Sequence, residues 1–191
     1  VLVGRALAQL QPGAHVATGS ARRRVQLARL RPGLRFSGLR GNIATRLRKL
    51  DDEIDAIVMA KAALDRLELD PGVVDVLATD DVVPQVGQGA LAVECRADDD
   101  TTIELLGAIT HAASRRALDA ERAFLAELGG DCTLPAGAHA VLVDDAVRIT
   151  GVLASTDERT LCRATLEGRD GVALGRELAG RLRAAVAAEA T

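Results

Sequence analysis

Aromatic side chains are almost absent from this chain of 191 residues, which contains two phenylalanines and no tyrosine or tryptophan. Proteins that bind single-stranded nucleic acids stack bases on aromatic side chains, so the composition argues against that class. No apolar run approaches the roughly 20 residues that a membrane-spanning helix needs. The chain also opens without the basic and apolar regions of a secretory signal. Because it starts at Val1 rather than Met, we expect the natural N-terminus to lie upstream.

Cysteine and histidine are also scarce, and their spacing matches no common metal site or disulfide framework. The three cysteines, Cys95, Cys132 and Cys162, are odd in number, far apart and never form a CxxC pair. The three histidines show no ligand spacing to one another or to the cysteines. We therefore expect no metal site, and we expect the reducing cytoplasm as the location.

Acidic residues are missing from the first 50 positions, which carry eleven arginines or lysines; all 27 acidic residues follow, although the net charge is only −3. Lysine is rare too, so nearly every positive charge is a guanidinium. A guanidinium binds carboxylate or phosphate through two parallel hydrogen bonds. The pattern predicts an anionic ligand for the N-terminal segment. The alternative is that arginine merely replaces lysine on a solvated surface.

Short apolar runs alternate with amphipathic stretches in the first half of the chain. We expect strands at 15–18, 34–39 and 55–60, followed by helices at 21–30, 43–54 and 62–67. This alternation is typical of a parallel α/β sheet. A further strand is expected at 90–95, after the glycine-containing segment 86–89.

The second half of the chain has a different pattern. Helices are expected at 101–109 and 114–128, strands at 138–143, 147–154 and 160–166, and a final helix at 171–188. Strands that follow one another through short turns form antiparallel hairpins. This half is therefore predicted to be α+β.

Helix-capping residues and arginines stand where the first two predicted strands end. Ser20 follows the first strand and Asn42 the second, each beside a glycine. In open parallel sheets, ligands bind at the carboxyl ends of the strands. The pattern predicts a binding pocket for carboxylates or phosphates. The alternative is that the two residues only cap helices and the arginines are solvated. The arginines concerned are Arg22, Arg23, Arg40 and Arg46.

Four motifs resemble the porphobilinogen deaminase (hydroxymethylbilane synthase) family in order and spacing. They are TGSARRRVQLARLRPGL, LRGNIATRLRKLDDEIDAIVMAKAALDRL, VGQGALAVECR and AERAFLAELGGDCTLPAGAHA. The likeness is close through 18–140 and looser beyond. It implies a transferase of tetrapyrrole (porphyrin and haem) biosynthesis, which condenses four porphobilinogens head to tail and releases ammonia.

The resemblance also implies a dipyrromethane cofactor, bound through a thioether to Cys132 in the motif GGDCTLP. Cys95 and Cys162, in predicted strands, are expected to be small core residues. Each porphobilinogen carries an acetate and a propionate, which are the kind of anion that an arginine-lined pocket binds. The positions that the family's cofactor- and substrate-binding residues match are Ser20, Arg22, Arg23, Arg40, Asn42, Arg46, Arg66 and Gln88.

The same resemblance implies a periplasmic-binding-protein-like α/β domain with a smaller α+β C-terminal domain. Residues 1–84 correspond to the second α/β domain of the family, 85–110 to a return segment of a mostly absent first domain, and 111–191 to the C-terminal domain that carries the cofactor cysteine. The family's catalytic aspartate belongs to a His-Ser-x-Lys-Asp motif that this sequence lacks. No catalytic residue is therefore assigned, and we expect the chain alone to be inactive. The family implies a monomer.

Two other classes remain open. A non-catalytic anion-binding module of the periplasmic-binding-protein type would share the α/β pattern and the arginines, but it gives no reason for a cysteine after Gly129-Gly130. A nucleic-acid binder would use the basic N-terminal segment for phosphate contacts. The arginines stand at turns beside helix caps rather than along one face. We therefore expect a small-molecule substrate, porphobilinogen, with no nucleic-acid or membrane partner.

Overall fold

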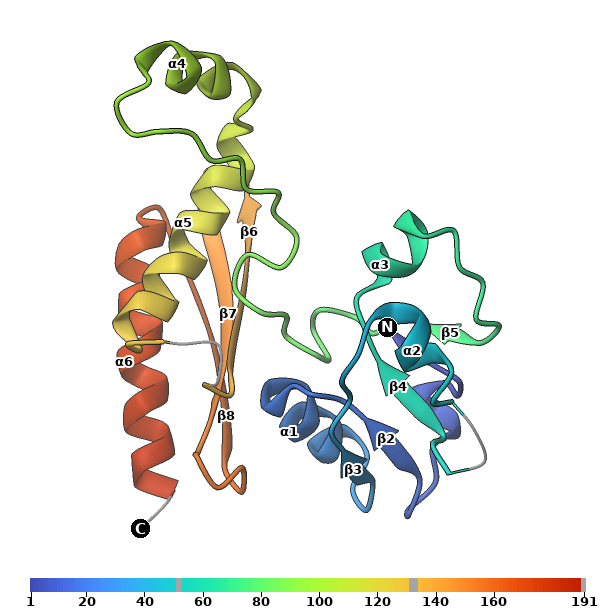
Figure 1. The fold of residues 1–191 in the computed structure, drawn as a ribbon. Coiled ribbons are helices and arrows are strands. Elements are labelled where there is room, and N and C mark those ends of the chain that lie inside the picture. Colours follow the sequence, from blue (N-terminus) through green and yellow to red (C-terminus); the bar gives the residue numbers. More distant parts are fainter. Residues whose placement is uncertain (51–52, 131–133, 190–191) are drawn as a thin grey trace. The chain divides into compact units, whose positions relative to one another are not determined.

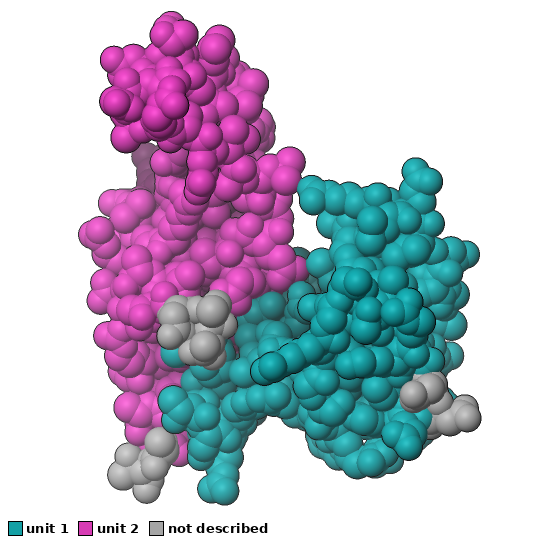
Figure 2. Space-filling view, in the orientation of Figure 1, with its two compact units in different colours: residues 1–82, 132–135, 154–161 teal, residues 83–131, 136–153, 162–191 magenta. Residues whose placement is uncertain are grey.

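The computed structural model describes residues 1–50, 53–130 and 134–189. The chain divides into two compact units, which Figure 2 shows in different colours. The first unit is built mainly from residues 1–82, and the second mainly from the remainder.

The first unit is a five-stranded sheet with helices on both faces (Figure 1). The strand order is β3-β2-β4-β1-β5; β2 runs parallel to β3 and β4, whereas β1 runs antiparallel to β4 and β5. The predicted parallel sheet is thus confirmed, with an antiparallel strand inserted. The elements are β1 (Leu2–Val3), the 3-10 helix η1 (Leu7–Gln9), β2 (His15–Ala17), α1 (Ala21–Leu30), β3 (Arg35–Ser37), α2 (Ile43–Leu47), β4 (Ala56–Val58), α3 (Lys61–Arg66) and β5 (Val74–Asp75).

Alternate strand residues supply two separate cores, because successive side chains of a strand point to opposite faces. Val16 packs with Leu27 of α1 on one face of the sheet. Its neighbour Ala17 packs with Leu64 of α3 on the other face. The sheet is therefore buried on both sides, as parallel sheets generally are.

Helix α1 begins and ends where the sequence predicts. Ser20 is its N-cap, and Arg31-Pro32-Gly33 follows its last residue, with Gly33 at φ +86°. Helix α2 is shorter than predicted, since it ends at Leu47. Leu50 and Ile54 still pack on the same core from beyond the helix. The apolar spacing thus correctly predicted that these two side chains pack against the core. It wrongly predicted that helix α2 extends to them.

The second unit combines a three-stranded sheet, in the order β6-β7-β8, with three helices. Strands β6 and β7 form an antiparallel hairpin. Helices α5 and α6 cover one face of this sheet (Figure 1), so the predicted fold class is confirmed: an α/β region followed by a smaller α+β region. The elements are α4 (Asp100–Ile109), α5 (Ala112–Glu127), β6 (Ala136–Val143), β7 (Ala146–Ala154), β8 (Leu161–Gly168) and α6 (Gly171–Glu189).

Helices α5 and α6 pack against each other with a glycine at the contact. A Cβ atom placed on Gly175 of α6 would overlap the carbonyl oxygen of Ala120 in α5. It would also lie 2.9 Å from the backbone nitrogen of Phe124, which is itself fully buried. This crossing therefore has no room for a side chain at position 175.

The strand predicted at 90–95 is wrong, since these residues form no strand in the structure. A strand needs a neighbouring strand to take up its backbone hydrogen bonds, and none lies beside this segment in the described residues. Leu91 and Val93 are 82% and 62% exposed. Cys95, expected in the core, is exposed for the same reason, whereas Cys162 is buried in β8 as predicted.

Candidate anion-binding site

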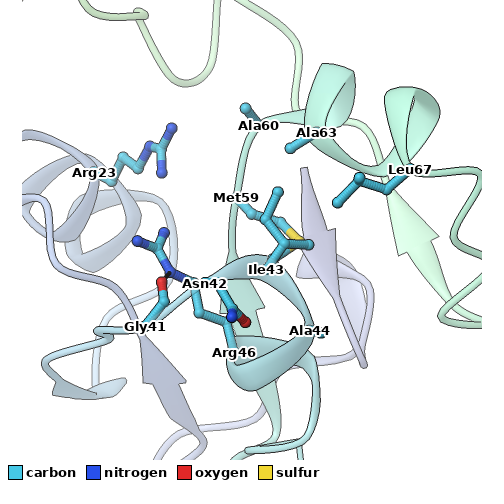
Figure 3. Close-up of a pocket in the computed structure, with 10 residues that line it drawn as sticks. All are labelled: Arg23, Gly41, Asn42, Ile43, Ala44, Arg46, Met59, Ala60, Ala63 and Leu67. Carbon is cyan, nitrogen blue, oxygen red and sulfur yellow. Dashed lines mark hydrogen bonds between the residues drawn. The ribbon is translucent and has the colours of Figure 1, made fainter.

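The carboxyl ends of the three parallel strands β3, β2 and β4 lie at one edge of the first sheet. The segments that follow them line a pocket of about 670 Å³ (Figure 3). Arg23 comes from the segment after β2, Asn42 and Arg46 from the segment after β3, and Met59 from the end of β4. The predicted position of an anion site, at the strand ends, thus coincides with a pocket that contains two arginines.

Arg23 is half-buried in this pocket and is held by the first turn of α1. The hydroxyl of Ser20 accepts a hydrogen bond from the Arg23 backbone nitrogen at 3.4 Å. The guanidinium Nη1 donates to the carbonyl oxygen of Val58 at 3.4 Å. Burial lowers the pKa of Arg23, and the positive charge of Arg46 lowers it further. A bound anion would relieve both costs, so the pocket favours a negatively charged ligand.

The turn before α2 holds the Arg46 side chain. Its Nε donates to the carbonyl oxygen of Gly41 at 2.8 Å. Gly41 has φ +116°, and a Cβ there would lie 2.9 Å from Thr45 Cγ2, so this position requires glycine. Figure 3 shows the Arg23 and Arg46 guanidinium groups on the same side of the pocket.

Asn42 has two roles in this turn. Its Oδ1 accepts a hydrogen bond from the Thr45 backbone nitrogen at 2.8 Å, which caps α2 as predicted. It also lines the pocket. Because the cap uses the oxygen, the amide nitrogen is the atom that can donate to a ligand.

The opposite wall of the pocket is apolar and was missed from the sequence. Ile43, Met59, Ala63 and Leu67 form it (Figure 3). Met59 directly follows strand β4, so the rule that ligands bind at strand ends could have found it. Two guanidiniums facing an apolar wall suit a ligand with an apolar ring body and carboxylate substituents.

The other predicted site residues do not line this pocket. Arg22 is only 4% exposed, and burial together with the charge of Arg23 lowers its pKa to about 10. Arg40 and Arg66 are exposed, and Gln88 belongs to a turn in the second unit. Cys132 lies outside the described residues. Of the predicted set, the structure brings Arg23, Asn42 and Arg46 together around one pocket, with Ser20 capping the helix that carries Arg23.

Metal-binding clusters and membrane-spanning helices are both absent from the part of the chain that the structure describes. No group of three or more histidine, cysteine, aspartate or glutamate residues there could hold a metal ion. No described helix combines the length and apolar character needed to cross a membrane.

The fold is that of an α/β protein with an arginine-lined pocket at its strand ends, and an α+β region follows it in the chain. Residues 1–104 match the family model "Porphobilinogen deaminase, dipyromethane cofactor binding domain", and residues 115–184 match "Porphobilinogen deaminase, C-terminal domain". The chain therefore belongs to the porphobilinogen deaminase family, which confirms the resemblance seen in the sequence.

Individual relatives agree with the family models. The chain is 43% identical over 180 residues to the porphobilinogen deaminase of Trichlorobacter lovleyi, covering 93% of this chain and 58% of the relative. It is 46% identical over 182 residues to that of a Roseiflexus species, covering 94% of this chain and 60% of the relative. The chain thus spans little more than half the length of these curated relatives.

Proposed function

We propose that this chain is part of a porphobilinogen deaminase, a transferase that condenses four porphobilinogens head to tail and releases ammonia. The single observation that carries the proposal is the family match over residues 1–104, the part of the chain that contains the Arg23–Arg46 pocket. Porphobilinogen is a pyrrole with acetate and propionate substituents. It has the apolar ring and the carboxylates that this pocket suits.

The residues of the pocket also fit a dipyrromethane cofactor. A volume of about 670 Å³ lies in the range of roughly 300–1,000 Å³ that is typical of small-molecule sites. Arg23 and Arg46 supply two forked donors for carboxylates, and Ile43 and Met59 supply apolar surface for pyrrole rings. When bound, dipyrromethane supplies the primer to which pyrroles are joined.

Within this proposal, the residues of the chain bind and orient the carboxylates rather than move protons. Arg23 and Arg46 fix pyrrole carboxylates by charge-assisted hydrogen bonds, and their mutual repulsion falls as the anion binds. Asn42 adds a donor from the rim of α2. The apolar wall keeps water from one side of the pocket, which strengthens these electrostatic contacts.

Cys132 is the proposed attachment point of the cofactor. This part of the proposal rests on the motif GGDCTLP, because Cys132 lies outside the described residues. A thiolate is the nucleophile that thioether formation needs. Cys95 is exposed and Cys162 is buried in β8. Neither of these two follows a Gly-Gly pair.

We propose that residues 1–84 and 111–191 are two domains of the whole protein and that 85–110 packs against a further domain. Leu91, Val93 and Ile109 support this, because 62–82% of each side chain is exposed and exposed apolar patches usually have a partner. The odd number and wide spacing of the cysteines support a cytoplasmic location. The family supports a monomer.

The alternative function is a non-catalytic anion-binding module. The family match favours the deaminase, and the two differ in product. Protein from the reading frame extended upstream should consume porphobilinogen, release ammonia and form hydroxymethylbilane. Binding of porphobilinogen without ammonia release would support the module instead.

A further inference from the structure

A buried carboxylate in the second unit holds a turn that the Arg23–Arg46 pocket does not include. Glu121, on α5, is 8% exposed. Its Oε2 accepts a hydrogen bond from the Gly87 backbone nitrogen at 2.8 Å. Its Oε1 accepts one from the Ala140 backbone nitrogen at 2.9 Å. One side chain thus joins three segments: the turn at 86–89, helix α5 and strand β6.

Neither donor N–H group bonds to a neighbouring strand: Ala140 is in register with Ile149 of β7, but its N–H donates to Glu121. Strand β6 lies at the edge of its sheet, so the Ala140 nitrogen points away from β7 and is paired by Glu121. Gly87 belongs to a turn between elements. His139 Nδ1 is 3.7 Å from Oε1, too far for a hydrogen bond, so the two backbone nitrogens are the close partners that define the carboxylate's orientation.

The turn is shaped to fit against α5 independently of this carboxylate. Gly87 has φ +68°, and a Cβ there would lie 3.2 Å from Leu118 Cδ1 in the preceding turn of α5. The Gln88 backbone nitrogen donates to the Gln85 carbonyl oxygen at 3.0 Å, which closes the turn. Glycine at 87 and glutamate at 121 therefore fix the same backbone from two sides.

We infer that Glu121 is a positioning residue, whose two carboxylate oxygens hold the 86–89 turn on α5 and β6 and so set the place of Gln88. The inference rests on the proposed function and adds one assignment to it: Gln88, which does not line the Arg23–Arg46 pocket but matches a binding position in the family resemblance, contacts the substrate or cofactor in the whole protein. The Gly87 and Ala140 N–H groups together require two acceptor oxygens from the side chain at position 121. Glutamine at this position keeps the size but offers one acceptor, and it turns an amide N–H₂ toward a backbone N–H.

Amide hydrogen exchange tests the structural half of this inference in the 191-residue chain. In Glu121→Gln, the Gly87 and Ala140 amides should exchange at least about tenfold faster than in the wild type, because each loses or weakens a charge-assisted bond. Glu127→Gln makes the same chemical change on an exposed position of α5 and should leave both rates unchanged. Protection of the Phe124 and Leu178 amides, in α5 and α6 of the same unit, reports that this unit remains folded.

Kinetics of the protein from the extended reading frame test the functional half. Glu121→Gln and Gln88→Ala should each raise KM for porphobilinogen several-fold. Glu121→Gln should add nothing in the Gln88→Ala background. If Glu121→Gln fails to fold, Gly87→Ala disturbs the same turn through the Leu118 contact and should show the same KM effect and the same dependence on Gln88.

Unchanged Gly87 exchange in Glu121→Gln would overturn the positioning role, as would additive effects of the Glu121 and Gln88 changes. A wild-type extended protein without porphobilinogen turnover would overturn the proposed function instead. In that case the amide exchange rates still decide whether Glu121 positions the turn.

Discussion

Arg46 contributes to the lowered pKa of Arg23, second only to burial. The two guanidiniums come from different helices, α1 and α2, that follow neighbouring parallel strands. Like charges are brought together in a folded protein at a cost, which a bound anion offsets. This relationship is the structural basis for proposing that the pocket binds a carboxylate.

Loss of either arginine should therefore weaken the site far more than loss of a neighbouring surface arginine. Removing one partner of a desolvated charge contact costs about 2–5 kcal/mol. Arg23→Leu and Arg46→Leu should each lower kcat/KM for porphobilinogen by well over tenfold in the extended protein. Arg48→Leu, on exposed Arg48 just after α2, is the matched control and should stay within about twofold. Equal losses in all three variants would indicate general charge rather than a shaped site.

Arg22 should make stability depend on pH in the alkaline range. Its pKa is lowered to about 10, below the unfolded value of roughly 12.5. Above pH 10 the folded state loses a proton that the unfolded state keeps, so stability rises with pH. Relative to Arg22→Met, the wild type should gain on the order of 1 kcal/mol in free energy of unfolding between pH 8 and pH 11. Urea unfolding of both proteins measures this difference, and a constant difference would contradict it.

The crossing of α5 and α6 should depend on Gly175. Alanine there would overlap the Ala120 carbonyl oxygen, and overpacking of this kind costs about 1–3 kcal/mol or more. Gly180 lies on the same helix, and a Cβ added there would meet no atom within 4 Å. Gly180→Ala should therefore be neutral or stabilise by about 0.5–1 kcal/mol. Thermal unfolding distinguishes the two, and equal shifts in Tm would show that the close crossing is wrong.

The sequence predicted helix bounds well where it contains both a capping residue at the start and helix-breaking residues at the end. The bounds of α1 follow from Ser20 and from Arg31-Pro32-Gly33, which are capping and breaking residues that the sequence itself displays. Strand β1 and strand β5 were missed because each is two residues long and carries no periodicity. The failed strand at 90–95 has the right composition, but a strand also depends on a neighbour that composition does not reveal.

The sequence predicted the position of the pocket in the fold, but not which residues line it. Arg22 and Arg23 are adjacent and looked equivalent in the sequence. Each helical residue turns by about 100° from the last, and the fold buries the first and places the second in the pocket. Glu121 lies in one of the four family motifs, but its role could not be predicted because its partners are backbone atoms 34 and 19 residues away.

The 191-residue chain alone should not turn over porphobilinogen. It lacks the His-Ser-x-Lys-Asp motif that the family resemblance implies, whose carboxylate would stabilise the positive charge that develops during pyrrole coupling. Purified chain should form no hydroxymethylbilane, and protein from the extended reading frame that restores the motif should form it. Robust turnover by the short chain would show that another group supplies this charge.

The intact mass of the protein from the extended reading frame tests the central claim most directly. The account predicts a mass increase of one covalently bound dipyrromethane in the wild type and in Cys95→Ser and Cys162→Ser. It predicts the unmodified mass in Cys132→Ser. A wild type without the adduct, or a Cys132→Ser protein that retains it, would contradict the account.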